Sequence, residues 1–244
     1  MLQITTPDGV AEAIVESSAD GGPGVLLFMD AFGLRPRIRE LAAEIASWGY
    51  VVLAPNVFHR VGTVAALAPT GDLTTPEAMG AFFAVAGPRI GQLTPTLASD
   101  DFPAWLDALR EVPGVAPGPI GTVGFCMGGR LAVLLSGAYP DDVAACAAIH
   151  TGGLVTDQPD SPHHAVEAAR AEYLFASADN DRSMTPENVQ TLGATLTTAG
   201  RVATNEIVPG AAHGFTMSDT VAWNEQATER VLAQLKDLFA RNLS

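Results

Sequence analysis

The hydrophobic residues of the chain fall into short continuous runs that alternate with segments of helical periodicity. Runs such as Val25 to Met29 are apolar at every position, which is typical of strands buried on both faces of a parallel sheet. Segments such as Arg37 to Trp48 instead repeat their apolar residues with the period of an amphipathic helix. Because strand and helix alternate along the chain, the pattern predicts an α/β fold with a mostly parallel central sheet and helices on both faces.

The same pattern gives the approximate limits of each element. Strands are expected at Leu2 to Thr5, Val10 to Val15, Val25 to Met29, Tyr50 to Ala54, Ile120 to Phe125, Val143 to His150, Tyr173 to Ser177 and Val202 to Val208. Helices are expected at Arg37 to Trp48, Pro76 to Val85, Ser99 to Leu109, Arg130 to Ala138, Ala165 to Ala171, Pro186 to Ala199 and Thr220 to Arg241. Prolines and glycines punctuate residues 56–97, where we expect a largely irregular lid or pocket wall. Residues 1–244 are expected to form a single domain.

Composition narrows the classes of partner. The chain has 244 residues, 48% of them hydrophobic, and a formal net charge of −14 at pH 7. Nucleic acids and anionic membranes attract positive patches, so this charge argues against both as partners. Met1 to Thr5 lacks the features of a signal peptide, and no apolar run approaches the roughly 20 residues that span a bilayer. We therefore expect a cytoplasmic protein, monomeric or a small homo-oligomer, that acts on a small molecule.

The cysteines and histidines show no ligand spacing. The two cysteines, Cys126 and Cys146, are too few for a disulfide framework, and no C-x-x-C pair suggests zinc. His163 and His164 lie in a Pro-rich loop without a cysteine or paired carboxylate nearby, and we expect them to be solvated; His59 stays ambiguous. We expect neither a metal nor another cofactor.

The segment Gly124-Phe125-Cys126-Met127-Gly128 carries the candidate chemistry. With Ser in place of Cys126, its spacing would be the G-x-S-x-G nucleophile elbow of α/β-hydrolases. Glycines two residues before and after the nucleophile remove Cβ atoms that would collide in a strained strand-to-helix turn. The Met127 N–H would point toward a developing oxyanion, and a thiolate at Cys126 would attack. Alternatively, Cys126 is an inert buried thiol beside a tight turn.

An acid and a histidine follow the elbow in the chain order of α/β-hydrolase triads. His213 lies between glycines directly after the last expected strand, where ligands bind in open sheets. Asp179 and Asp181 follow the preceding strand, and we prefer Asp181 as the acid, with Asp179 capping the turn. His150 ends the strand after the elbow, and we expect it to line the site or to satisfy a core hydrogen bond.

The second oxyanion donor is expected in the loop after Val25 to Met29. The Ala31 N–H is the candidate. Its neighbour Asp30 is either a plain turn residue or a carboxylate that exchanges a proton with the thiol.

Three motifs together resemble the dienelactone hydrolase (carboxymethylenebutenolidase) family. The resemblance implies an α/β-hydrolase fold without a large cap domain, and hydrolysis of an ester or lactone through an acyl-cysteine, with no metal. It also implies that Cys126, Asp181 and His213 form the triad and that the Ala31 and Met127 amides hold the oxyanion. The motifs are Asp30-Ala31-Phe32-Gly33, Gly124-Phe125-Cys126-Met127-Gly128-Gly129 and Gly210-Ala211-Ala212-His213-Gly214-Phe215.

Two positions depart from the family pattern. Asp30 falls where the family usually carries a glutamate that helps to activate the thiol, and Asp is one methylene shorter. Met217 falls where the family places an arginine that holds the substrate carboxylate, and only Arg89 is conceivable as another such arginine. Losing a charge-assisted contact of about 1.5–3 kcal/mol weakens binding of dianionic substrates. We therefore expect a substrate other than dienelactone itself.

The residues leave other functions open. A thioesterase or another acyl transferase would use the same parts, because a fold does not fix its substrate. The chain is alternatively a non-catalytic binding protein with a hydrolase fold, although the candidate nucleophile Cys126 and the candidate base His213 are both present. A redox-sensing thiol at Cys126 is a third alternative.

Overall fold

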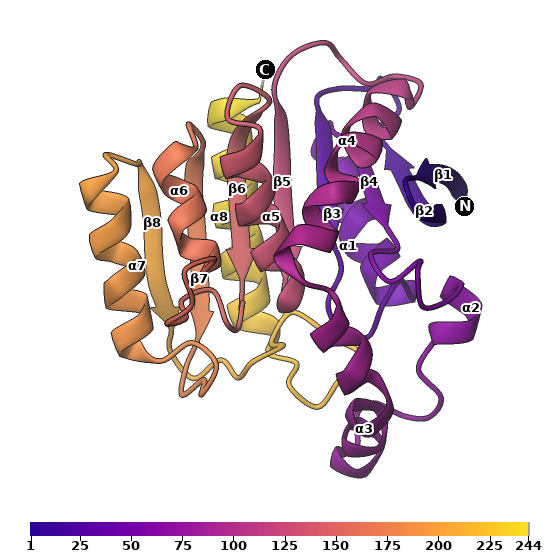
Figure 1. Cartoon of the computed structure of the whole chain (residues 1–244), viewed down its shortest axis with the longest axis vertical. Helices are drawn as coiled ribbons and strands as arrows, with labels where there is room; N and C mark the ends of the chain where they lie inside the picture. The colour runs from indigo at the N-terminus through magenta and orange to yellow at the C-terminus, as the bar shows by residue number, and fades with distance from the viewer. Residues whose placement is uncertain (244) are drawn as a thin grey trace.

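The computed structural model describes residues 1–243 and contains one eight-stranded sheet (Figure 1). Its spatial order is β1-β2-β4-β3-β5-β6-β7-β8; β1 and β2 pair antiparallel with their neighbours, and the remaining strands run parallel. The strands are β1 (Leu2–Thr6), β2 (Gly9–Ser17), β3 (Gly24–Phe28), β4 (Val51–Pro55), β5 (Ile120–Phe125), β6 (Val143–Ile149), β7 (Glu172–Ala178) and β8 (Ala203–Val208). The predicted α/β-hydrolase architecture is confirmed.

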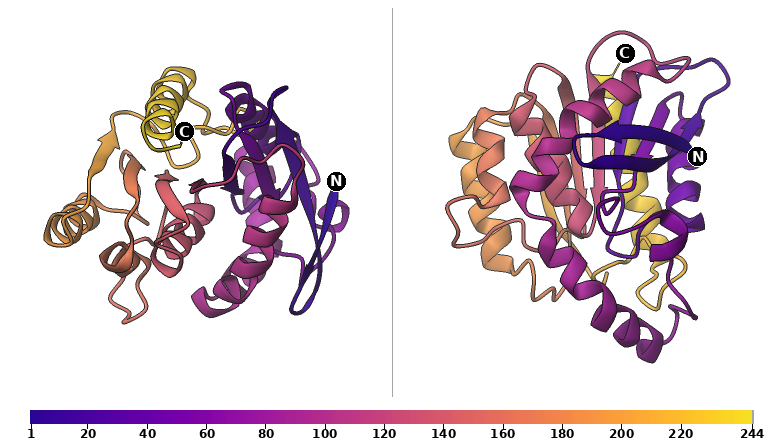
Figure 2. Two further views of the ribbon diagram at one scale, coloured as in Figure 1. Left: turned by 90° about the horizontal axis from the view of Figure 1, so that it is seen from above. Right: turned by 45° about the vertical axis from the view of Figure 1, so that its right-hand side comes forward.

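Helices cover both faces of the sheet. Figure 2 shows α1 and α8 on one face, and α4, α5, α6 and α7 on the other. The helices are α1 (Pro36–Ser47), α2 (Val64–Leu67), α3 (Pro76–Gln92), α4 (Pro95–Glu111), α5 (Met127–Ala138), α6 (Ala165–Ala168), α7 (Pro186–Thr198) and α8 (Glu225–Asn242), with a 3-10 turn at Pro162–His164. Within residues 1–243, no helix is both long enough and apolar enough to cross a membrane.

Aromatic side chains fill the two layers between sheet and helices. Phe28 of β3 lies against Phe102 and Trp105 of α4, with ring centroids 6.4 and 5.6 Å apart. On the opposite face Tyr50, just before β4, meets Phe239 of α8 edge-on at 5.6 Å. These strands are buried at every position, which explains their unbroken hydrophobic runs.

Residues 56–97 are less irregular than expected: the helix predicted from Pro76 is present and continues to Gln92, beyond its expected end at Val85. The segment contains α2, α3 and the first residues of α4. Thr75 and Thr94 cap α3 and α4 through their hydroxyl oxygens, and Pro76 and Pro95 occupy the first helical positions, where proline is favourable. In Figure 1, α3 lies below α4, at the end of the molecule toward which β6 and β7 point, so it lies on the side of the sheet where the candidate site is.

Candidate active site

Cys126 occupies a strained turn between β5 and α5. Its backbone has φ 53° and ψ −124°, a left-handed region that non-glycine residues rarely adopt. A Cβ at Gly124 would lie 2.1 Å from the Gly128 carbonyl oxygen, and one at Gly128 would lie 2.4 Å from the Phe28 carbonyl oxygen. Both glycines are therefore required for the close approach of β5, α5 and β3, as the spacing predicted.

The loops after β7 and β8 bring two side chains to the thiol. His213 Nε2 lies 3.1 Å from Cys126 Sγ, and His213 Nδ1 lies 2.6 Å from Asp181 Oδ2. The other oxygen of Asp181, Oδ1, accepts hydrogen bonds from the backbone N–H and the hydroxyl group of Ser183. The carboxylate is thus held on both sides, and it fixes the ring so that Nε2 faces the sulfur.

The three groups shift one another's protonation. Burial alone would lower the pKa of His213, but its hydrogen bonds to Asp181 and Cys126 raise that pKa to about 10. Burial would raise the pKa of the Asp181 carboxyl group, but hydrogen bonds from His213 and Ser183 lower it to about 2. At neutral pH the site therefore holds an imidazolium between the Asp181 carboxylate and the sulfur atom of Cys126.

Asp181 should make the protein more acid-sensitive. The pKa of Asp181 is about 2 in the folded protein and 3.8 in the unfolded chain. Between these two pH values the unfolded chain therefore binds a proton at Asp181 that the folded protein does not bind. The stabilisation, about 2 kcal/mol, is present above pH 3.8 and lost as the pH falls through about 2. Urea unfolding from pH 5 to pH 2 should show the wild-type advantage over Asp181→Asn shrinking with acid. A constant difference between the two proteins would contradict this assignment.

Asp179 has a different role. Its backbone N–H donates to the Ala211 carbonyl oxygen at 2.7 Å, and its Oδ2 accepts from the Gly210 N–H at 2.9 Å. It therefore ties the end of β7 to the loop that carries His213, as a turn-forming aspartate does. Of the two alternatives that the sequence left open, Asp181 is the one that contacts His213.

His150 is a buried support beneath the elbow. It has φ 41° and no exposed surface. The Cys126 N–H donates to the Ile149 carbonyl oxygen at 3.0 Å and also lies 3.2 Å from His150 Nδ1, and His150 Nε2 is hydrogen-bonded to Thr216 Oγ1 at 2.7 Å. Burial, and then the charge of His213, lower the pKa of His150 well below its usual value. A neutral His150 therefore links the elbow to the loop of His213.

The two expected oxyanion donors lie at adjoining ends of β3 and α5. Met127 is the first residue of α5, so its N–H has no partner within the helix and points along the positive end of the helix dipole. The end of β3 packs against the first turn of this helix, as the contact of Gly128 shows, and Ala31 follows in the next loop. The Ala31 carbonyl oxygen accepts from Arg89 Nη2 at 3.0 Å, which anchors this loop to α3.

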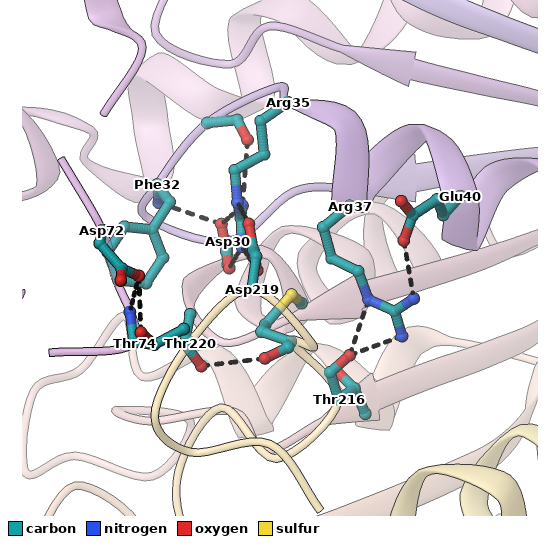
Figure 3. Close-up of polar contacts among 12 residues, drawn as sticks. Asp30, Phe32, Arg35, Arg37, Glu40, Asp72, Thr74, Thr216, Asp219 and Thr220 are labelled. Atoms are coloured by element: carbon teal, nitrogen blue, oxygen red, sulfur yellow. Dashed lines mark hydrogen bonds and ion pairs between the residues drawn. The ribbon is translucent and has the colours of Figure 1, made fainter. Parts of the chain in front are cut away.

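Asp30 pairs with an arginine that the sequence analysis missed (Figure 3). Arg35 Nη1 lies 2.6 Å from Asp30 Oδ1 and Nη2 lies 3.0 Å from Oδ2, while Arg35 Nε reaches Asp219 Oδ2 at 2.6 Å. Asp30 and the side chain of Arg35 are 2% and 5% exposed. Of the two alternatives left open for Asp30, these contacts favour the turn residue, because its Oδ1 also accepts from the Phe32 N–H at 3.0 Å and both of its oxygens lie on Arg35. No sequence signal connects Arg35 to Asp219, 184 residues away.

Met217, Arg89 and His163 are buried, and each is held by its own neighbours. Met217 is fully buried, and Arg89 is held by the carbonyl oxygens of Ala31 and Leu67 and by the rings of Phe58 and Phe82. The expectation that His163 is solvated was wrong: it is 5% exposed and its Nδ1 lies 2.7 Å from Ser161 Oγ. Across residues 1–243, no group of three His, Cys, Asp or Glu side chains is placed to hold a metal ion.

Comparisons with known proteins identify similar sequences and similar folds. The model of the dienelactone hydrolase family matches residues 11–243. A putative carboxymethylenebutenolidase of Synechocystis sp. is 26% identical over 91% of this chain and 87% of its own length. A carboxymethylenebutenolidase of Rhodococcus opacus is 35% identical over 59% of this chain and 50% of its own length. The crystal structure of a putative dienelactone hydrolase from Klebsiella pneumoniae superposes with a TM-score of 0.73 at 21% identity, over 98% of this chain and 96% of that one.

Proposed function

The chain belongs to the dienelactone hydrolase family, and from that premise we propose that it hydrolyses carboxylic esters or lactones through an acyl-cysteine on Cys126. One observation carries the proposal. The sulfur of Cys126, the ring of His213 and the carboxylate of Asp181 form an unbroken line of contacts at 3.1 and 2.6 Å. This line gives a nucleophile, a proton carrier and an orienting anion in contact with one another.

Each residue has a defined step. The Cys126 thiolate adds to the carbonyl carbon, and the negative oxygen that forms accepts hydrogen bonds from the Ala31 and Met127 amides. When the tetrahedral intermediate collapses, His213 gives its Nε2 proton to the departing alcohol oxygen and leaves an acyl-cysteine. His213 then takes a proton from water, the hydroxide adds to the acyl carbon, and the thiolate departs as the acid is released. Asp181 stabilises the imidazolium throughout.

Met217 and Arg89 do not offer a positive charge that could bind the carboxylate of dienelactone. Met217 occupies the position where the family pattern has a carboxylate-binding arginine, and its apolar side chain cannot pair with an anion. Arg89 already donates to two backbone carbonyl oxygens, so it is not free to hold a substrate. We therefore propose a substrate other than dienelactone.

The test is turnover of a small panel by the wild-type protein. We expect hydrolysis of 4-nitrophenyl acetate or of a simple lactone at a higher kcat/KM than dienelactone. Rapid quenching followed by intact-mass measurement should reveal one acyl group, located on Cys126 by peptide mapping. Faster hydrolysis of dienelactone than of the neutral aryl ester would overturn the substrate proposal, and an acyl group on any residue other than Cys126 would overturn the mechanism.

A further inference from the structure

Arg130 lies one helical turn after the nucleophile. It is four residues from Cys126 on α5, and residues at this spacing share one face of a helix. Helical side chains lean toward the N-terminus and cover the preceding turn. The guanidinium group of Arg130 is therefore directed toward the turn that presents the thiol.

A second element places Arg130 beside the candidate triad. In the loop after β6, a Cβ at Gly153 would lie 3.8 Å from Arg130 Nη1, and a Cβ at Gly152 would lie 3.5 Å from His213 Cε1. Consecutive residues of this loop thus contact Arg130 and His213. The arginine and the histidine line adjoining parts of the same edge of the site.

The charge of Arg130 lacks a partner in the part of the chain described, residues 1–243. No hydrogen-bond acceptor and no carboxylate within 4.0 Å neutralises it there, and its side chain is half-buried. Burial lowers the pKa of Arg130, and the Cys126 thiolate opposes this shift, but an arginine stays protonated at neutral pH. By contrast, the buried Arg35 is paired on both sides by Asp30 and Asp219. Solvent still reaches the guanidinium group of Arg130, because none of its nitrogens is both buried and without a hydrogen-bond partner, so the group is open to an anion.

Arg130 and Gly153 also line a small hollow, whose lining includes neither Cys126 nor His213. The hollow measures about 170 Å³. Leucines from α5 and from the α3–α4 junction line one part of it, and Thr156, Gln158 and Asp160 line another, so both apolar and polar groups face the space. Asp160 lies on the rim, but it is exposed to solvent, which screens its charge. The leucines of the lining are Leu93, Leu131 and Leu134.

We propose that Arg130 binds a carboxylate carried by the acyl half of the substrate, so that half esters of short dicarboxylic acids are preferred over neutral esters. The expected preference among esters rests on the proposed function, because it presupposes ester hydrolysis at Cys126. The acyl half is the relevant one because it becomes attached to Sγ and stays within reach of a cation on the same helix face. The site differs from the position of Met217, which lies on the loop after β8.

The kinetic test compares mono(4-nitrophenyl) succinate with 4-nitrophenyl butyrate, after subtraction of spontaneous hydrolysis. In Arg130→Gln, kcat/KM for the succinate should fall by about 10- to 100-fold, mainly through KM, because a charge-assisted contact is lost. For the butyrate the change should stay below about 3-fold. Arg170→Gln, which removes an equal charge from an exposed arginine in another part of the chain, should leave both values unchanged. Equal losses on both esters, or no loss on the succinate, would overturn the inference.

A second test needs no hydrolysis. Iodoacetate and iodoacetamide both alkylate a thiolate with loss of iodide, but only the former carries a carboxylate. The ratio of their rate constants at Cys126 should fall about tenfold or more in Arg130→Gln and stay at the wild-type value in Arg170→Gln. If both rates fell equally, Arg130 would act on the thiol rather than on an anion, and the inference would fail. The alkylation ratio could fall in Arg130→Gln as expected while the wild-type protein hydrolyses none of the esters. That outcome would refute the proposed function and leave anion binding by Arg130 supported.

Discussion

Replacing Cys126 by Ala is expected to reduce ester hydrolysis by about 10⁴- to 10⁶-fold, which is the scale seen when a nucleophile is removed from a catalytic triad. The substitution removes the atom that bonds to the acyl carbon and leaves His213 and the two backbone amides in place. The fold should tolerate it, because the left-handed backbone of the turn is the same for both residues. Steady-state rates with 4-nitrophenyl acetate, together with circular dichroism and thermal unfolding, test this.

Cys146 provides the matched control. It is the other cysteine, fully buried in β6, and burial raises the pKa of its thiol, so it has no route to a substrate. Cys146→Ala should keep hydrolysis within about threefold of wild type and lose only modest stability from the small cavity. If Cys126→Ala retained more than a tenth of the wild-type rate, the acyl-cysteine mechanism would be wrong, and a nucleophile other than this thiol would have to be found.

Replacing Asp181 by Asn is expected to lower kcat by about 10³- to 10⁴-fold. The amide is the same size, but it carries no charge to stabilise the imidazolium of His213. It also offers one oxygen where the carboxylate offers two, and that oxygen cannot serve both His213 and the two donors of Ser183. The ring would be left in the wrong tautomer or orientation, so the thiol would lose its proton acceptor.

Asp179→Asn is the control for this change. Its amide oxygen can still accept from the Gly210 N–H, so the turn should hold and kcat should fall by less than about tenfold. The pair of variants separates the two aspartates that the sequence left as alternatives. Equal losses in both would show that the loop, and not a specific carboxylate, matters; a larger loss in Asp179→Asn would reverse the assignment.

Local patterns were sufficient for most of the fold. Unbroken apolar runs marked the inner strands because these strands are buried on both faces. The threonine–proline pair at Thr185 and Pro186 correctly marked the start of α7. The same pair at Thr75 and Pro76 marked the start of α3, but the pair at Thr94 and Pro95, which begins α4, was interpreted as a break and the helix was expected only from Ser99. This proline should have been interpreted as a helix start, because a proline directly after a capping threonine begins a helix more readily than it ends one.

Helix limits were less well determined where a cap lies outside the periodic segment. Thr220 was expected to begin the last helix, which in the structure starts at Glu225 after the capping residue Asn224. Its expected end at Arg241 is within one residue of the observed end. End effects depend on a single side chain reaching a backbone N–H, and periodicity does not register such a contact.

The sequence by itself determined the parallel α/β sheet, the elbow around Cys126 and the order in which Cys126, Asp181 and His213, the proposed nucleophile, acid and base, follow one another along the chain. These features follow from burial and steric constraints that act within a few residues, such as the two glycines that flank the turn. Only the tertiary structure decided that Asp181 contacts His213, that Asp30 pairs with Arg35 and Asp219, that His150 supports the elbow and that Arg130 stands unpaired beside it within residues 1–243. Such contacts join side chains from loops far apart in the chain. Their partners are set by how the strands order in the sheet and how the loops pack at its edge, and no local pattern encodes that.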